Sequence, residues 1–339
     1  MRRRAAALAG LCLLAASLQA PGPSLAAGED IGEILVVSQG AATLTRLPAD
    51  GSPRLLALAR APAGIAVDAA GRVAAVSHPE LGQVSLIDLG EDTVSDGLDI
   101  GGQPFGIAFT EEGRLLVTDW SRDLLVRLDP ATGEAEELAV GTAPSAVVVD
   151  AARGIAYTVD RESDRVSRVD LAGFSVTGTA GVGRAPFAAA LSADGAWLHV
   201  ANVQSGDVSI VDTASMTEVA RVAIGGMPYG VAVDPATGLV LVTDQEGGRL
   251  VMVDPQARRV RGEVRVGDYP EAVAVTGDGR AHVANWFSDT VATVDLATLK
   301  VESTEVAAGP RMLAVLRGAA GRAATNGWTA TDKGRGNGQ

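Results

Sequence analysis

The fold is decided by the stretch of residues 186–226, which reads PFAAALSADGAWLHVANVQSGDVSIVDTASMTEVARVAIGG. It contains four short apolar runs, at 188–191, 197–201, 208–211 and 218–224, and turn-forming residues separate them. Within the runs the apolar residues follow period two and not the helical period of 3.6. The stretch therefore predicts four short strands joined by tight turns.

The same unit recurs along the chain, and each copy begins at a proline. These prolines are spaced by 42, 40, 42, 42, 42 and 40 residues, at Pro62, Pro104, Pro144, Pro186, Pro228, Pro270 and Pro310. A fixed period of this size indicates a repeat architecture. Four-stranded units of this length are typical of β-propeller blades.

A second interval supports the register of the six complete units. The second strand of each unit ends at a polar residue, and an Asp ends the third strand ten residues later. The ten-residue pairs are His78 and Asp88, Asp119 and Asp129, Asp160 and Asp170, Asn202 and Asp212, Asn285 and Asp295, and Asp244 and Asp254. This interval accommodates one hairpin turn and one short strand at about 3.3 Å per residue.

The residues outside the six units predict a seventh blade. Three strands are expected before Pro62, at 34–37, 43–47 and 54–58, and one strand is expected at 312–316. We predict an all-β fold, a seven-bladed β-propeller of four-stranded antiparallel blades over residues 31–317. The N-terminal strands would pair with the C-terminal strand, which closes the ring and removes exposed sheet edges.

The two ends of the chain are predicted to lie outside the propeller. Arg2, Arg3 and Arg4 precede an apolar segment at 5–18, which is shorter than the roughly 20 residues that span a bilayer. We therefore expect residues 1–27 to be a cleavable signal peptide and the protein to be periplasmic or secreted, with no transmembrane segment in the mature chain. Residues 318–339, rich in Gly, Ala and Thr, are predicted to be disordered.

Composition narrows the classes of partner and cofactor. The chain has 28 basic and 41 acidic residues and a net charge of −13, which argues against nucleic acid as a partner. Its one cysteine, Cys12, lies in the predicted signal peptide, so the mature chain would have no disulfide, thiolate metal site or c-type haem attachment. We expect a monomer without a resident cofactor. A Ca²⁺ or Mg²⁺ ion held by carboxylates is the alternative.

The second strands carry a recognisable tetrapeptide. It reads LVTD at 116–119 and 241–244, and HVAN at 199–202 and 282–285. Together with the proline-led first strands and the third strands that end in Asp, this resembles the YVTN family of extracytoplasmic β-propeller repeat proteins. The resemblance implies the fold, and it implies that the loops between blades share a face with the turns after the second strands. It does not assign an activity, because propellers host lyases, lactonases, dehydrogenase subunits and scaffolds.

That shared face would carry two rings of side chains around the channel mouth. The turn ring comprises the residues that end the second strands, His78, Asp119, Asp160, Asn202, Asp244 and Asn285, followed in sequence by Trp120, Arg161, Gln245 and Trp286. The post-proline ring comprises Phe105, Ser145, Phe187, Tyr229, Glu271 and Arg311. The Asp and Asn side chains either bond nearby backbone N–H groups or converge on a cation.

The aromatic residues concentrate in these two rings. Five of the twelve in the chain fall there: Phe105, Trp120, Phe187, Tyr229 and Trp286. Beside Arg161 and Arg311 they suit a surface that binds a peptide, a sugar or a partner protein. The alternative is that they fill the junctions between blades.

Two functions from different classes follow. The first is a non-catalytic scaffold that binds an envelope protein or a small ligand at this rim. The second is a metal-assisted lyase or lactonase at the channel mouth, with His78 as the candidate acid or base, whereas His199 and His282 are expected to pack between blades. A role as an electron-transfer partner is a third option. The sequence contains neither a Gly-x-Ser-x-Gly nor a His-x-x-x-His motif to support a serine or zinc hydrolase.

Overall fold

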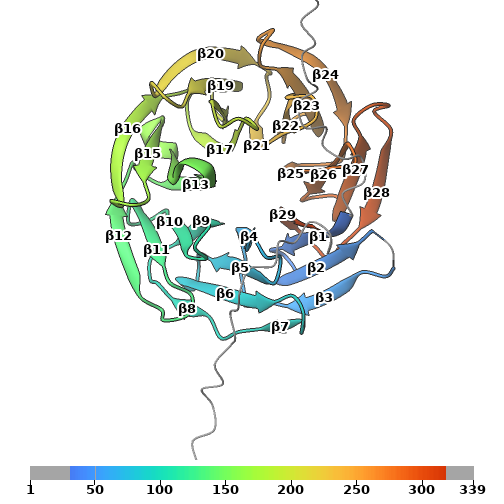
Figure 1. Cartoon of the computed structure of the whole chain (residues 1–339). Helices are drawn as coiled ribbons and strands as arrows, with labels where there is room; N and C mark the ends of the chain where they lie inside the picture. Colours follow the sequence, from blue (N-terminus) through green and yellow to red (C-terminus); the bar gives the residue numbers. More distant parts are fainter. Residues whose placement is uncertain (1–30, 50, 318–339) are drawn as a thin grey trace, which may run out of the picture.

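The computed structural model describes residues 31–49 and 51–317, so the predicted signal peptide and the predicted disordered tail lie outside the described residues. The described chain forms seven antiparallel sheets arranged as blades around a central channel (Figure 1). Within these ranges the only helical segments are two 3₁₀ turns, η1 (Ala151–Arg153) and η2 (Arg161–Ser163). The predicted seven-bladed propeller is confirmed.

Within each blade the strands lie side by side, with the first-named strand nearest the channel and the last-named strand at the outer edge. Blade 1 contains β29 (Pro310–Arg317), β1 (Ile31–Ser38), β2 (Thr43–Pro48) and β3 (Arg54–Ala57). Blade 2 contains β4 (Ile65–Val67), β5 (Val73–His78), β6 (Gln83–Asp88), β7 (Thr93–Val94) and β8 (Leu98–Asp99). Blade 3 contains β9 (Pro104–Phe109), β10 (Leu115–Asp119), β11 (Leu124–Leu128) and β12 (Ala135–Ala139). Blade 4 contains β13 (Pro144–Asp150), β14 (Ile155–Asp160), β15 (Arg165–Asp170) and β16 (Ser175–Gly181).

The remaining three blades follow the same order. Blade 5 contains β17 (Pro186–Leu191), β18 (Trp197–Asn202), β19 (Asp207–Asp212) and β20 (Thr217–Ala223). Blade 6 contains β21 (Pro228–Val233), β22 (Val240–Asp244), β23 (Arg249–Asp254) and β24 (Arg259–Arg265). Blade 7 contains β25 (Pro270–Thr276), β26 (Arg280–Asn285), β27 (Thr290–Asp295) and β28 (Val301–Glu305).

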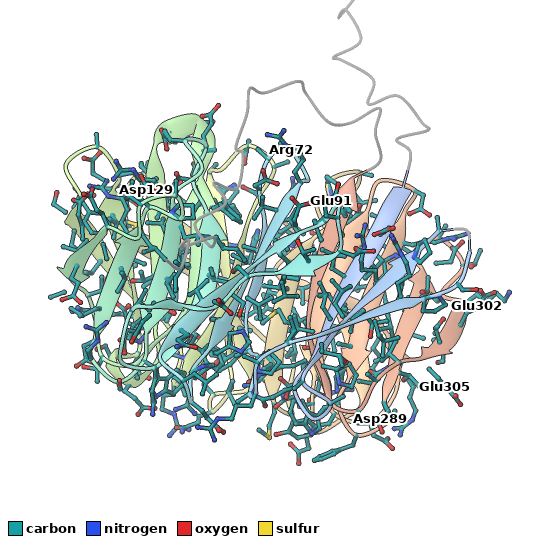
Figure 2. All side chains as sticks on the ribbon, turned by 90° about the horizontal axis from the view of Figure 1, so that it is seen from below. Arg72, Glu91, Asp129, Asp289, Glu302 and Glu305 are labelled. Atoms are coloured by element: carbon teal, nitrogen blue, oxygen red, sulfur yellow. The ribbon has the colours of Figure 1, made fainter. Side chains whose placement is uncertain are left out.

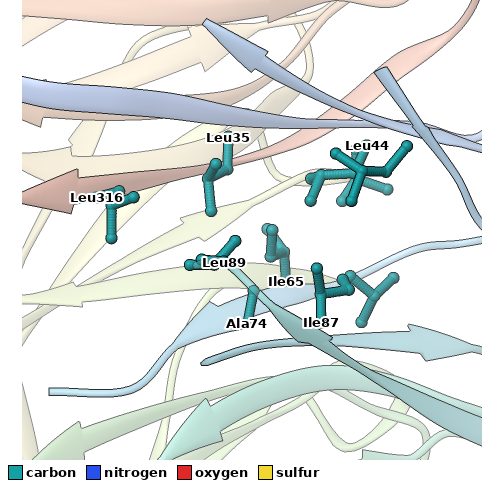
Figure 3. Close-up of a cluster of buried hydrophobic side chains, with 10 residues drawn as sticks. Leu35, Leu44, Ile65, Ala74, Ile87, Leu89 and Leu316 are labelled. Atoms are coloured by element: carbon teal, nitrogen blue, oxygen red, sulfur yellow. The ribbon is translucent and has the colours of Figure 1, made fainter. Parts of the chain in front are cut away.

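Blade 1 closes the ring by pairing the two ends of the described chain. The C-terminal strand β29 is its innermost strand and pairs antiparallel with β1, with Ile34 opposite Val315. The faces of blades 1 and 2 then enclose Leu35, Leu44 and Ile87 (Figure 3). Burial of each of these side chains contributes about 1.5–3 kcal/mol, so closure is tied to the packing between blades.

The outer edge of blade 2 departs from the predicted single fourth strand. It is split into β7 and β8, both of which pair with β6. Between them Ser95 exchanges hydrogen bonds with Leu86, from its backbone N–H to the carbonyl at 2.8 Å and from the Leu86 N–H to its hydroxyl at 3.0 Å. The Ser95, Asp96 and Gly97 run favours turns over strands, which explains the break.

In some blades a hydroxyl group of the second strand joins the start of the first strand to the next blade. In blade 6 the Thr243 hydroxyl accepts from the Gly230 N–H at 2.7 Å and donates to the carbonyl of Glu271 in blade 7 at 2.8 Å. In blade 2 the Ser77 hydroxyl bridges Gly64 and Phe105 in the same way. These bridges fix the backbone of the residue after the next proline.

The loops between blades and the turns after the second strands lie on one face, as the family resemblance implies. The N–H of Trp120 donates to the Gln103 carbonyl, and that of Gln245 to the Met227 carbonyl, both at 3.0 Å. Figure 2 shows Asp289 and Glu305 at this end of the molecule and Arg72, Glu91 and Asp129 at the opposite end. We call the first end the mouth face.

The Asp residues that end the third strands lie on the opposite face and shape its hairpin turns. Asp212, for example, accepts from the N–H groups of Ala214 at 3.0 Å and Ser215 at 2.8 Å. This is the structural role that their regular spacing predicts. The two 3₁₀ turns of the described chain are far shorter than a membrane-spanning helix.

Candidate functional site at the channel mouth

An irregularity at the start of the first strands sets the direction of the post-proline side chains. In blade 5 the pairing steps from Pro186 opposite Asn202 to Ala188 opposite Ala201, which leaves Phe187 out of the ladder. The same shift occurs after Pro144 in blade 4. A bulge of this kind re-aims a side chain. The post-proline residues consequently line the channel.

One half of the post-proline ring is an aromatic cluster. Phe187 stacks on Tyr229 at 3.8 Å between ring centroids and meets Phe105 edge-on at 5.7 Å. Trp120, from the turn after β10, lies 5.5 Å from Phe105 and 6.5 Å from Phe187. Such pairs contribute about 0.5–1.5 kcal/mol each beyond the area they bury. Four aromatics from blades 3, 5 and 6 thus form one cluster.

The other half is polar and is organised around Arg311. Its guanidinium donates to the Gln39 side chain at 2.7 Å and to the Tyr229 hydroxyl at 3.5 Å. Its Nε lies 3.8 Å from Oε2 of Glu271. The other Glu271 oxygen accepts a hydrogen bond from the Gln245 amide at 3.0 Å. Ring closure therefore assembles a network from blades 1, 6 and 7.

Glu271 is an unusual carboxyl group. It is only 5% exposed, and its Oε2 has no hydrogen-bond partner. Burial raises the pKa of Glu271 to about 7, although Arg311 and the Gln245 amide oppose that rise. Burial, and then the neighbouring Glu271, also raise the pKa of Tyr229, so the phenol stays neutral.

Two cavities meet at these rings. The mouth hollow has a volume of about 520 Å³ and is lined by Pro79, Glu80, Gln103, Phe105, Trp120, Arg161, Phe187, Val203, Met227, Tyr229, Gln245, Tyr269 and Arg311. A second cavity of about 180 Å³ lies within the channel. Four residues line both spaces and separate them: Phe105, Phe187, Tyr229 and Arg311.

Two guanidinium groups line the mouth hollow, and each has a carboxylate neighbour: Arg161 pairs with Glu162, and Arg311 lies beside Glu271. Arg161 lies over the Trp120 ring at 5.6 Å, and Arg311 lies over the Phe105 ring at 5.2 Å. Among the described lining residues Glu80 is the one carboxylate, and it lies 3.8 Å from the Arg60 guanidinium. Two guanidinium groups therefore converge on one hollow of a chain whose net charge is −13.

The predicted turn ring is buried inside the blades. Asp119 accepts backbone N–H bonds from Gln103, Ser121 and Arg122 at 3.0–3.1 Å and a side-chain bond from Arg122 at 2.5 Å. Burial raises the pKa of Asp119, but these bonds outweigh it and hold the pKa below its ordinary value. The carboxylate thus stabilises the turn after β10 and the loop before β9.

The other members of the turn ring have the same kind of role. Asp244 accepts from the Met227 N–H and from Arg249, both at 2.8 Å. The equivalent residues of blades 4, 5 and 7 are Asp160, Asn202 and Asn285. They are also buried and form hydrogen bonds within their own blades or to the preceding loop. The described residues contain no group of three or more His, Cys, Asp or Glu side chains placed to hold a metal ion.

The three histidines are all internal. The sequence places His78 at the rim, but the structure buries it in blade 2, where its Nδ1 lies 3.1 Å from the Arg60 carbonyl. Burial lowers the pKa of His78. Burial also lowers the pKa of His199 and of His282 to about 4. His282 contacts Thr293 at 3.1 Å, so it packs inside its blade.

The structure brings most of the predicted rim aromatics and arginines together. Phe105, Trp120, Arg161, Phe187, Tyr229 and Arg311 all line the mouth hollow, and Trp286 borders it, 5.7 Å from the Arg311 guanidinium. Sequence reasoning missed Gln39, Met227 and Tyr269. Met227 and Tyr269 each directly precede a repeat proline, and Gln39 follows the end of β1, so extending both rings by one residue would have found them.

Comparison with known proteins reveals similarity of fold. At the level of sequence, no family profile and no curated protein matches the chain. Virginiamycin B lyase from Staphylococcus aureus superposes with a TM-score of 0.64 and 12% identity over 72% of this chain and 84% of that one. A functionally unknown protein from Desulfotomaculum acetoxidans DSM 771 superposes with a TM-score of 0.72 and 11% identity, over 84% of this chain and 98% of that one.

A third solved structure extends the range of activities found among these neighbours. The dihydro-heme d1 dehydrogenase NirN gives a TM-score of 0.64 and 15% identity, over 88% of this chain and 78% of that one. Identities this low show the propeller fold alone. Function must be argued from the mouth hollow itself.

Proposed function

We propose that this chain is an extracytoplasmic β-propeller of the YVTN type that acts by binding a small organic anion in the mouth hollow, without catalysis. The basic and apolar N-terminal sequence supports export, and the repeated LVTD and HVAN strands support the family. The ligand we infer carries a carboxylate or similar group on a flat apolar body.

One observation carries the proposal. The mouth hollow gathers Arg161 and Arg311 above a cluster of aromatic faces in a protein that is otherwise strongly acidic. The guanidinium fork matches carboxylate geometry, and a charge-assisted hydrogen bond contributes about 1.5–3 kcal/mol. The aromatic faces of Trp120 and Phe105 suit a flat ring.

The size and rigidity of the mouth hollow fit a small ligand. Its volume of about 520 Å³ lies within the range of small-molecule sites. The backbones of Phe105 and Glu271 are fixed by the hydroxyl bridges from Ser77 and Thr243. A site on such fixed strands loses little conformational freedom when it binds.

The chemistry of the lining favours binding over catalysis. Guanidinium groups, amides and aromatic rings orient a ligand but do not exchange protons near neutral pH, and Glu271, whose pKa is about 7, lines the channel cavity and not the mouth hollow. The alternative, a metal-assisted lyase or lactonase, needs His78 at the mouth, and His78 lies inside blade 2. Similarity of fold to virginiamycin B lyase transfers no residue to this chain.

Tryptophan fluorescence tests the proposal, because Trp120 lines the mouth hollow and Trp286 borders it. The purified protein would be titrated with 2-naphthoate, 2-naphthamide and 2-naphthylamine. We expect the carboxylate to bind and the amide and amine to bind at least about tenfold more weakly, since tenfold corresponds to about 1.4 kcal/mol.

Matched variants identify the site. Arg161→Gln and Arg311→Gln should each weaken 2-naphthoate binding by about tenfold or more. Arg221→Gln is the control, because Arg221 pairs with Glu218 on the outer strand β20. Equal affinity for the acid and the amide, or equal effects of all three variants, would overturn the proposal.

A further inference from the structure

We propose that Glu271 couples anion binding in the mouth hollow to the uptake of one proton. Arg311 would turn from Glu271 to the bound anion, and Glu271 would then take a proton from solvent and become a neutral acid. The inference rests on the proposed function and adds to it a regulation by pH.

Arg311 is placed to serve either partner. It lines both the mouth hollow and the channel cavity, so a small rotation changes which space its guanidinium faces. Its short hydrogen bond, 2.7 Å, is to Gln39, whereas its Nε is 3.8 Å from Glu271. That separation is an ion pair without a hydrogen bond. The attraction to Glu271 is therefore one that a better-placed anion can replace.

Glu271 has little else to stabilise its negative charge. Oε1 accepts one bond, from Gln245, and Oε2 accepts none. A buried carboxylate that loses its only cation is strongly destabilised, and the group responds by taking up a proton. The neutral acid keeps its bond from Gln245 and no longer competes for Arg311.

The elements packed around Glu271 supply no second cation. From β21 it faces the neutral phenol of Tyr229, and from β29 it faces Arg311. β22 ends at Asp244, which is paired with Arg249 at 2.8 Å, and is followed by the uncharged Gln245. β26 meets the start of β25 through Asn285, and β25 itself contains no other ionisable residue.

The electrostatics agree with this geometry. With Arg311 still beside it, the pKa of Glu271 is already raised to about 7 by burial. Turning Arg311 away removes the main influence that holds this pKa down, so the pKa rises further in the complex. By linkage, affinity for the anion is constant well below pH 7 and falls by about tenfold per pH unit above it.

Calorimetry measures the proton directly. The wild-type protein would be titrated with 2-naphthoate at pH 8 in phosphate and in Tris, which have different heats of ionisation. We expect the observed binding heats to differ by an amount that corresponds to about one proton taken up per ligand bound. This measurement needs no variant and so does not depend on whether a substituted protein folds.

Two variants assign the proton to Glu271. Glu271→Gln should bind 2-naphthoate with no proton uptake and with an affinity that does not change between pH 6 and 8. Glu302→Gln is the matched control, since Glu302 is exposed on β28 of the same blade and pairs with Lys300 at 2.6 Å. The control should keep the wild-type proton uptake and pH slope.

The outcomes separate the two proposals. Binding of 2-naphthoate with equal heats in both buffers, or a Glu271→Gln variant that keeps the wild-type pH slope, overturns the coupling and leaves the proposed function standing. Absence of 2-naphthoate binding at every pH overturns the proposed function and the coupling with it.

Discussion

The turn ring and the post-proline ring lie on the same face of the same blades, and they behave in opposite ways. Turn-ring side chains such as Asp119 and Asp244 point into their own blades, where hydrogen bonds occupy them. Post-proline side chains such as Phe187 and Arg311 point to the channel, where they meet side chains from other blades. The turn-ring position holds Asp or Asn in five of the six complete repeats, with His78 as the exception, and it stabilises the repeat itself. A position whose chemistry changes between repeats serves the molecule once.

The difference has a local cause. In blades 3 and 6 the turn-ring Asp accepts backbone N–H bonds where the loop meets the turn after the second strand. In blades 4, 5 and 7 the turn-ring residue instead bonds side chains of its own blade or a carbonyl of the preceding loop. The post-proline backbone is already held by hydroxyl bridges such as that of Thr243 to Glu271. Its side chain is therefore free to vary.

The largest effect we expect is from a substitution in the turn ring. Asp119→Ala leaves three backbone N–H groups and the Arg122 guanidinium without their buried acceptor. We expect the free energy of unfolding to fall by about 3–5 kcal/mol. Urea denaturation measures this loss.

The matched control is Asp254→Ala on the opposite face. Asp254 accepts two backbone N–H bonds in a solvent-exposed turn, from Gln256 and Ala257. The Asp254→Ala substitution should lower the free energy of unfolding by about 1 kcal/mol. Equal losses in the two variants would mean that burial of the turn ring has no special importance.

A smaller effect is expected where two blades touch. A Cβ added at Gly230 would lie 2.3 Å from the carbonyl oxygen of Glu271 and 3.1 Å from Cα of Ala272. Because both neighbours are backbone atoms, Gly230→Ala should destabilise the protein by about 1–3 kcal/mol. Gly181→Ala is the control, since nothing lies within 4 Å of a Cβ there. Thermal unfolding of both variants should separate them, and equal midpoints would contradict close packing at Gly230.

Ionisation of Glu271 should make stability depend on pH. Its folded-state pKa of about 7 lies above its ordinary value of 4.5, so the folded state holds the proton more tightly than the unfolded chain. The resulting stabilisation is complete below pH 4.5 and is lost as pH rises toward 7, by about 1.4 kcal/mol per pH unit. Glu271→Gln removes this contribution.

The measurement is the difference between two urea denaturation series. Carboxylates with lowered pKa values, such as Asp119, have the opposite pH dependence, but they are common to wild type and Glu271→Gln. The stability of wild type relative to the variant should therefore fall between pH 5 and pH 7. A constant difference over that range would show that Glu271 has an ordinary pKa.

Sequence alone predicts the architecture because most blades are formed by residues that lie close together in the sequence. Repeat prolines such as Pro186, turn residues and third-strand Asp residues set the strands within about 42 positions, and the leftover strands identify the closing blade. The site could be predicted only in part, because its side chains come from distant parts of the sequence and meet only in the folded ring. Gln39 and Arg311 lie at opposite ends of the described chain, yet their side chains are 2.7 Å apart once blade 1 closes. The direction of His78 is also set by packing, and the prediction of a rim position for it was wrong.

Ser145 gives the smallest expected effect and the sharpest test of the comparison between the rings. In blade 6 the Thr243 hydroxyl bridges to the next blade, but the equivalent residue of blade 4 is Val159, which has no hydroxyl group. Ser145 makes that bridge instead, donating to the Phe187 carbonyl at 2.8 Å. It is thus a member of the post-proline ring with a structural role.

Ser145→Ala should therefore behave like a weak turn-ring variant. We expect a loss of about 1 kcal/mol in the free energy of unfolding and unchanged affinity for 2-naphthoate. Arg311→Gln, in the same ring, should weaken binding by about tenfold or more, and above pH 7 it should also lower stability, because Glu271 then loses its only cation. If Ser145→Ala weakened binding without loss of stability, position in the ring would matter more than hydrogen bonding. In that case the position of a residue in the ring, and not its hydrogen bonds, would decide whether it stabilises a blade or contacts the ligand.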